Sequence, residues 1–88
     1  MKRWVVVFRT LSNINRLKII GILSRGNKMN VSDIAQQLHI SFNATSNHLA
    51  MLKNLDVLES QGAGGHVFYF INSRMPNDFR KILSHVNK

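Results

Sequence analysis

Apolar residues recur at helical spacing near both ends of the chain. Trp4, Val7, Phe8 and Leu11 predict a helix over residues 2–11, although the run of three valines there would also suit a strand. The stretch SNINRLKIIGILSRGN predicts a clearer helix, with Asn13 as its N-cap, Gly26 as its stop, and an apolar stripe of Leu17, Ile20 and Leu23.

The middle of the chain predicts two helices joined by a tight turn. After a connector or short strand KMN, Asn30 stands three residues before Asp33 and opens the helix VSDIAQQL. HIS makes the turn, and Ser41 caps a second helix that should end near Asp56. The inner side of this second helix carries Thr45, Leu49, Leu52 and Leu55.

The last third of the chain predicts a hairpin and a closing helix. VLESQ, GAGG and HVFYFIN are typical of a strand, a flexible turn and a strand. Pro76 should lie in the first turn of the final helix, whose apolar positions are Phe79, Ile82, Leu83 and Val86. The predicted fold is mainly α (α+β): one winged helix-turn-helix domain over residues 1–88, with a two-stranded β-hairpin wing and terminal helices for dimerisation.

The charge balance favours an anionic partner. Twelve Lys and Arg face four Asp and Glu, a formal charge of +8 in 88 residues. Nucleic acid is the commonest partner for so basic a small domain, and a solvated basic surface without a partner is the alternative.

Composition also argues against several classes of protein. The absence of cysteine excludes disulfides and Cys-ligated metals within these residues. Four scattered acidic residues offer little for acid/base or nucleophilic catalysis, and GAGG is not followed by the GK[ST] of a phosphate-binding loop, so we expect no enzyme and no cofactor. The apolar run WVVVF is too short for a signal peptide or membrane span, which predicts a cytoplasmic protein.

The sequence resembles the ArsR-type winged helix-turn-helix repressors. LSNINRLKIIGIL is similar to the family pattern L-S-D-P-x-R-L-x-I-L, and VSDIAQQLHISFNATSNHLAMLKNLDVL to V-x-E-L-A-x-x-L-x-L-S-x-x-x-V-S-x-H-L-x-x-L-x-x-x-G-L-V. GGHVFYFIN resembles the returning strand of the wing, with Tyr69 at its tyrosine. The resemblance implies a DNA-binding regulator whose terminal helices pair with those of a second subunit.

Four departures from the family pattern change what is expected of this chain. Asp56 replaces the glycine after the reading helix, a position where Asp tolerates left-handed geometry better than most residues. His66 stands where the wing usually carries arginine, which weakens a minor-groove contact. The family's Cys-x-Cys metalloid site is missing, and Asp78 with His85 falls short of its zinc site. No metal or small-molecule effector is therefore indicated.

The outer face of the second central helix is the predicted reader of double-stranded DNA. By helical spacing it carries Phe42, Asn43, Ser46, Asn47 and Ala50. Asn can pair with adenine, Ser can serve several bases, and Phe or Ala can meet the thymine methyl. The face lacks Arg and Lys, so it favours A·T-containing sites over guanine.

Affinity would then depend on phosphate contacts. Amides at the helix starts near Ser32 and Ser41 are candidates, with plain N-capping as the alternative role. The side-chain candidates are Lys53, Arg16, Lys18, Lys28 and His48, of which Lys53 has a solvated charge and His48 a packing role as alternatives. Gly64, Gly65 and His66 of the wing complete the predicted interface, although a turn that needs positive φ explains the glycines equally well.

The terminal helices carry more apolar residues than a small core needs. The predicted dimer interface consists of Trp4, Val7, Phe8, Phe79, Ile82, Leu83 and Val86, and covering the protein's own core is the alternative. A two-fold dimer would set two reading helices about 34 Å apart on an inverted repeat. The leading hypothesis is a dimeric sequence-specific repressor. An architectural or RNA-binding winged helix without sequence choice and a protein-interaction module remain alternatives.

Overall fold

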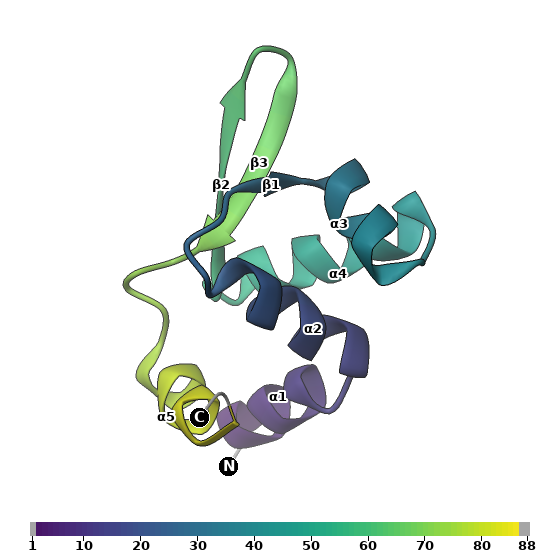
Figure 1. Ribbon diagram of the computed structural model, residues 1–88. Coiled ribbons are helices and arrows are strands. Elements are labelled where there is room, and N and C mark those ends of the chain that lie inside the picture. Colours follow the sequence, from purple (N-terminus) through teal and green to yellow (C-terminus); the bar gives the residue numbers. More distant parts are fainter. Residues whose placement is uncertain (1, 87–88) are drawn as a thin grey trace.

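The computed structural model describes residues 2–86, which form a winged helix-turn-helix. The molecule measures 40 × 25 × 24 Å, with the β-hairpin at one end and the terminal helices at the other (Figure 1). In chain order the elements are α1 (Lys2–Leu11), α2 (Ile14–Leu23), β1 (Met29–Asn30), α3 (Val31–Leu38), α4 (Phe42–Asn54), β2 (Leu58–Ala63), β3 (His66–Ile71) and α5 (Asn77–Val86).

Side chains cap the three central helices at the predicted positions. The Asn13 carboxamide oxygen accepts from the amides of Asn15 and Arg16, and Asn30 accepts from the amide of Asp33. The Ser41 hydroxyl oxygen accepts from Ala44 N at 3.0 Å. Each of these bonds satisfies an amide that the helix itself leaves without a partner, so the starts of α2, α3 and α4 are set locally by sequence. The capping role considered for Ser32 is wrong, because Asn30 performs it.

Both helices of the helix-turn-helix end at a non-glycine residue with left-handed geometry. His39 has φ 57° and Asp56 has φ 63°. After each of them the next amide reaches back five residues, from Ile40 to Ala35 O at 3.2 Å and from Val57 to Leu52 O at 3.0 Å. These are Schellman motifs, which normally place glycine at the left-handed position. The geometry expected for Asp56 is confirmed.

The predicted two-stranded hairpin is extended by a third strand, β1, so the stretch KMN forms the short strand that was one of its two predicted alternatives. β3 pairs antiparallel with β2 from Leu58↔Ile71 to Ala63↔His66, and its other edge pairs with β1 through Met29↔Tyr69 and Asn30↔Phe68. The connector before α3 therefore ties the helix-turn-helix to the wing.

Two boundaries differ from the predicted ones. The hairpin turn is only Gly64-Gly65, with φ 58° and 80°, because that pair closes a two-residue turn and lets Ala63 pair with His66. Gly62 and Ala63, the first two residues of GAGG, therefore lie in β2 and not in the turn. Pro76 precedes α5 instead of lying inside it, and its carbonyl accepts from the Arg80 amide at 3.0 Å.

One core joins all the helices to the base of the wing. It is built around α2 and the inner side of α4, and Val7 of α1 and Phe79 of α5 close it from the terminal helices; its buried apolar members are Val7, Leu11, Ile19, Ile20, Leu23, Ile34, Leu49, Leu52, Val57, Leu58, Phe79 and Leu83. Val7 and Phe79 have no exposed surface and Leu83 has 6%. For these three predicted interface residues, the burial favours the alternative role of covering the protein's own core.

Candidate nucleic-acid interface

The exposed side of α4 is the face predicted to read DNA. Four of its five predicted residues are exposed to solvent, namely Phe42, Asn43, Asn47 and Ala50, and Ser46 is half-buried. On the opposite side Thr45, Leu49 and Leu52 are all 0% exposed. The predicted division of this helix into a polar outer face and an anchored inner face is confirmed.

The start of α4 is held by hydrogen bonds involving Ser41. Its hydroxyl oxygen caps the Ala44 amide, while its carbonyl accepts from Thr45 Oγ1 at 2.8 Å and from Thr45 N at 3.1 Å. Thr45 is buried, so its two hydrogen bonds to the Ser41 carbonyl are shielded from competing water. The first turn, which carries Phe42 and Asn43, therefore has a defined direction.

The wing presents its turn and an apolar strand to solvent. Gly64, Gly65 and His66 are exposed at the tip. The His66 ring centroid lies 6.3 Å from that of Phe68, and Val67 is 47% exposed. Because Gly64 and Gly65 carry no side chain, another backbone can approach the tip closely. His66 follows them directly and places an imidazole beside the tip.

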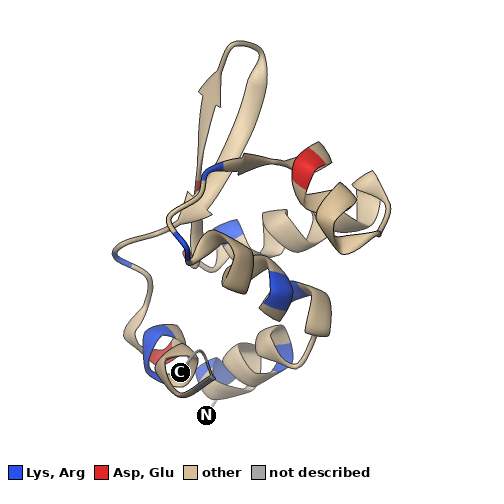
Figure 2. Cartoon of the chain, viewed as in Figure 1, with Lys and Arg blue, Asp and Glu red and all other residues tan. Residues whose placement is uncertain are grey.

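The positive charge is distributed unevenly over the fold. Residues 29–73, which form the helix-turn-helix and the wing, contain Lys53 as their only basic residue of the Lys or Arg type, against Asp33, Asp56 and Glu59. The other eleven Lys and Arg lie before residue 29 or after residue 73. Figure 2 shows the hairpin and the outer end of α4 without basic residues, and basic residues on α1, α2 and α5. The reading surface is thus close to neutral.

Two of the predicted phosphate partners already contact other residues of the protein. The guanidinium of Arg16 donates from Nε to Thr10 O at 2.9 Å and holds the end of α1. Lys28 Nζ lies 3.2 Å from Gln61 Oε1 and 4.7 Å from the centroid of the Phe70 ring. Lys18 and Lys53 are exposed. Of the four predicted Lys and Arg partners, Lys18 and Lys53 are therefore the best placed to bind phosphate.

His48 lies on the flank of α4, where neighbouring groups act on its imidazole. Burial lowers the pKa of the ring, and the positive charge of Arg16 lowers it further. Both effects favour the neutral ring at pH 7, since they act on a group whose ordinary pKa is about 6.5. A neutral, partly packed imidazole fits the packing role better than that of a phosphate-binding cation.

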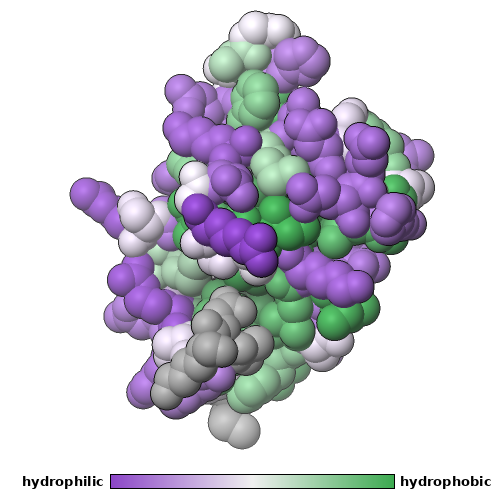
Figure 3. Space-filling view, viewed as in Figure 1, coloured by the Kyte–Doolittle hydropathy of each residue, from purple (hydrophilic) through white to green (hydrophobic). Residues whose placement is uncertain are grey.

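Apolar side chains remain exposed on α1. Trp4 and Phe8 are 40% and 57% exposed, and their ring centroids are 5.9 Å apart. Ile82 of α5 is half-buried, and the side chain of Val86 lies outside the described residues. Figure 3 shows hydrophobic surface over the lower part of the molecule, where α1 lies, and a mostly hydrophilic surface toward the wing.

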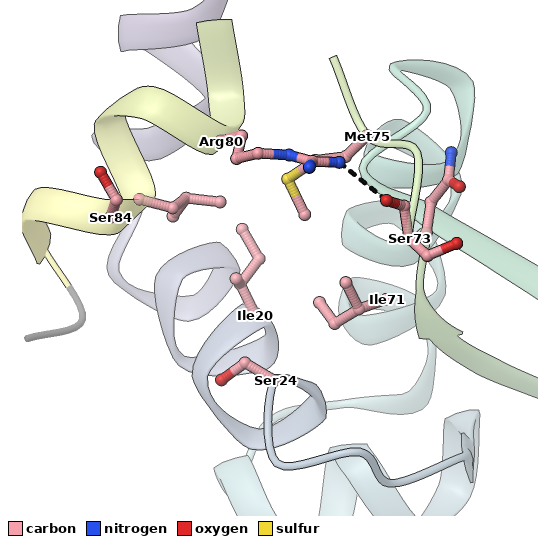
Figure 4. Close-up of a pocket in the computed structure, with 9 residues that line it drawn as sticks. Ile20, Ser24, Ile71, Ser73, Met75, Arg80 and Ser84 are labelled. Carbon is pink, nitrogen blue, oxygen red and sulfur yellow. Dashed lines mark hydrogen bonds between the residues drawn. The ribbon is translucent and has the colours of Figure 1, made fainter. Parts of the chain in front are cut away.

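A hollow of about 350 Å³ lies where α5 meets α2 and the end of β3. Ile20, Ile71 and Leu83 line it, and Arg80 spans its rim with Nη2 donating to Ser73 O at 2.7 Å (Figure 4). Among residues 2–86, no three His, Cys, Asp or Glu side chains are grouped so that they could hold a metal ion. In the same range, no helix is both long and apolar enough to cross a bilayer.

Comparison with known proteins decides the family. The sequence model described as "Bacterial regulatory protein, arsR family" matches residues 13–60, from the cap of α2 into the wing. The chain belongs to the arsR family of bacterial regulatory proteins. The resemblance drawn from the sequence motifs and the winged helix-turn-helix fold predicted from the pattern are both confirmed.

Relatives within the arsR family include two curated regulators and solved structures. The transcriptional repressor SdpR of Bacillus subtilis is 32% identical over 83 residues, 93% of this chain and 91% of SdpR. The cadmium resistance transcriptional regulatory protein CadC of Listeria innocua is 42% identical over 66 residues, 75% of this chain, which spans only 56% of CadC. The homodimeric winged helix-turn-helix domain of Mb0332 from Mycobacterium bovis superposes with a TM-score of 0.77 at 24% identity, over 97% of this chain and 75% of that one.

The structure settles features that the residue pattern left open or did not reveal. The stretch KMN was expected as a connector or a short strand, and at two residues β1 is too short for polar and apolar alternation to decide between them. The binding of Arg16 to the end of α1 depends on contacts between separate helices. The uneven distribution of charge, in contrast, can be read from the sequence, because Lys53 is the only Lys or Arg between Lys28 and Arg74.

Proposed function

We propose that this arsR-family chain is a DNA-binding transcriptional regulator that acts as a sequence-specific repressor. The proposal rests on the way α4 is held and on the side chains that it exposes. Its start is fixed by Ser41 and Thr45, its inner side is anchored in the core, and the short polar side chains of Asn43 and Asn47 project from its free side. A helix of this kind beside a wing can enter the major groove and present amides to base edges.

The near-neutral reading face supports selection of sequence rather than general attraction to DNA. A protein that binds any duplex depends on many Lys and Arg contacts to phosphate. Here the helix-turn-helix and wing offer only Lys53. Base contacts by Asn43, Asn47 and Ser46 must then supply a large share of the discrimination, and the asparagines favour adenine.

We further propose a homodimer formed through the terminal helices. Trp4 and Phe8 give exposed aromatic surface on α1, and Val5 on the same helix is 50% exposed. Mb0332, whose fold this chain shares, is described as homodimeric, which is consistent with that arrangement. Of the interface residues predicted from the sequence, Trp4, Phe8 and Ile82 keep that role, while the buried Val7, Phe79 and Leu83 support them from behind.

The signal to which the regulator responds does not follow from its relatives. CadC is named for cadmium resistance, but the 88 residues of this chain contain no cysteine from which a thiolate site for a soft metal could be built. We therefore propose DNA and a second copy of the chain as its partners, in the cytoplasm, and no metal.

Selection from random duplex DNA tests the proposal. The protein is incubated with random duplexes of about 30 base pairs, bound duplexes are recovered over several rounds, and the enriched sequences are read. We expect an inverted repeat with half-sites about 10 base pairs apart, each with adenines. Recovery of no common sequence, together with a steep dependence of affinity on salt, would instead support the alternative of a winged helix that binds without sequence choice.

A further inference from the structure

A second surface lies beside the reading helix and shares part of its face, through Asn47 and Ala50. A groove of about 500 Å³ runs between the C-terminal half of α1 and the C-terminal half of α4. Its size lies within the roughly 300–1,000 Å³ of pockets that take small molecules. The lining residues are Val6, Arg9, Thr10, Arg16, Asn47, Ala50, Met51, Asn54 and Leu55.

The chemistry of the lining is that of an amphipathic anion site. The apolar part of the wall comes from Val6, Ala50, Met51 and Leu55, and the polar part contains two arginines, two asparagines and no acidic residue. An apolar body could therefore lie against α4 while an anionic group meets Arg9 and Arg16, which have no carboxylate partner in the groove.

Arg16 is poorly satisfied on the side that faces the groove. Its Nε is well bonded to Thr10 O, but Nη1 has the thioether sulfur of Met51 at 2.8 Å, and Nη2 reaches Arg9 O only at 3.5 Å. A thioether is a weak acceptor for a charged donor. Burial lowers the pKa of the nearby His48 imidazole, and the positive charge of Arg16 lowers it further. The Arg16 guanidinium can therefore offer hydrogen-bond donors and a positive electrostatic potential to an incoming anion.

The groove stays accessible when the proposed dimer forms. On α1, Val6 and Thr10 lie one turn apart, and at about 100° per residue they are on roughly the opposite side of the helix from Trp4 and Phe8. A second subunit seated on the two aromatic rings would leave Val6 uncovered, and Arg9, one turn beyond Val5, would lie at the edge of the dimer face. Asn47 and Ala50, in contrast, belong both to the groove and to the reading face.

We propose that this groove binds a small aromatic or aliphatic carboxylate, with its acid group on Arg9 and Arg16 and its apolar body on Met51 and Ala50, and that the bound molecule excludes DNA from α4. Binding to the groove stands by itself, whereas exclusion of DNA rests on the proposed function. The groove would make the regulator responsive to an organic acid, although the sequence indicated no effector.

The direct test is titration of the ¹⁵N-labelled protein without DNA, followed by amide chemical shifts. The probes are 1-naphthoate, the uncharged 1-naphthalenemethanol and inorganic phosphate. We expect saturable shifts on α1 and α4 with naphthoate, and binding at least about ten-fold weaker for the other two, since a hydrogen bond to a charged group is worth roughly that factor. Arg9→Gln should weaken naphthoate binding about ten-fold, and Arg25→Gln, a matched change on an exposed arginine outside the groove, should leave it unchanged.

Several results would overturn the groove as an acid site. Equal binding of the alcohol would mean that the groove is merely apolar, and equal binding of phosphate would mean that it cradles the DNA backbone. Shifts centred on Trp4 and Phe8, or no saturable shifts, would place naphthoate elsewhere or nowhere.

Competition with DNA is then measured on a selected duplex. Naphthoate should raise the apparent Kd for that duplex with the unmodified protein and have about ten-fold less effect with Arg9→Gln. Naphthoate bound in the groove with no change in DNA affinity would overturn the exclusion of DNA. A protein that selects no duplex would fail the proposed function while leaving the naphthoate titration valid.

Discussion

Arg3 and Asp78 join the first helix of the protein to the last. Nε of Arg3 lies 2.6 Å from Oδ2 of Asp78 and Nη2 lies 3.3 Å from Oδ1, a paired contact between residues 75 positions apart. The same guanidinium lies 5.3 Å from the centroid of the Phe79 ring, whose side chain is fully buried. The pair therefore fixes α5 against α1 at the place where the core closes.

The pair should make stability depend on pH in the acid range. The hydrogen bond from Arg3 lowers the pKa of the Asp78 carboxyl below its ordinary value, so the folded state favours the carboxylate. This contribution is present above the unfolded pKa of about 3.9 and is lost as the pH falls through the lower folded pKa. Because the pair is partly exposed, Asp78→Asn should lower the free energy of unfolding at pH 7 by no more than about 1 kcal/mol.

Urea unfolding at neutral pH and at a pH of about 2.5, below the ordinary pKa of Asp, checks the role of Asp78. The difference between Asp78→Asn and the unmodified protein should shrink at the lower pH, where the carboxyl becomes protonated. Glu59→Gln, on the exposed part of β2, provides the control. A difference that is the same at both pH values would show that the ion pair contributes nothing.

Phe8→Glu should convert the proposed dimer into a monomer. The ring is 57% exposed on α1, so its replacement costs the folded protomer little, whereas a carboxylate buried in a dimer interface would be strongly unfavourable. Size-exclusion chromatography with light scattering measures the mass. Val67→Glu, which changes a similarly exposed apolar residue on the wing, should leave the dimer intact. A Phe8→Glu protein that keeps the mass of two chains would place the interface elsewhere.

Lys53 should account for much of the salt dependence contributed by the reading half of the protein. It is exposed at the end of α4 and is the only Lys or Arg between residues 29 and 73. Removal of one phosphate-binding cation reduces the slope of log K against log salt by about 1, so Lys53→Gln should reduce it by about 1 per subunit. Lys81→Gln on α5 is the matched change, and equal slopes for both variants would remove Lys53 from the interface.

His39→Gly should stabilise the protein. His39 is exposed and ends α3 with φ 57°, a conformation that costs an L-residue about 1 kcal/mol and glycine little. Thermal unfolding should show an increase of several degrees. Gln37→Gly, inside the same helix and also exposed, should lower the midpoint because it adds only freedom to the unfolded chain. A lower midpoint for His39→Gly would mean that the imidazole makes a stabilising contact of its own.

The helices could be predicted from sequence because their signals are local. Asn13, Asn30 and Ser41 each cap the helix that follows them, and a cap needs only its own neighbouring amides. The outer face of α4 was predictable for the same reason, since helical spacing alone separates Asn43 and Asn47 from the buried Leu49.

Features that depend on contacts between distant residues were not predictable. Val7 and Phe79 lie at apolar helical positions, as Trp4 and Phe8 do, and only the packing of α1 against α5 decides that the first pair is buried and the second exposed. The third strand forms because Met29 pairs with Tyr69, which lies far along the chain in β3. The groove beside α4 likewise exists only where α1 and α4 meet.

The central claim is that α4 selects its site through Asn43 and Asn47. The decisive measurement is a binding titration at one fixed salt concentration, with a selected duplex and with the same duplex after its adenine pairs are replaced by guanine pairs. The unmodified protein should prefer the selected duplex by about a thousand-fold or more, and Asn47→Ala should reduce that preference at least about ten-fold without changing affinity for the altered duplex. Equal affinity of the unmodified protein for the two duplexes would contradict this claim.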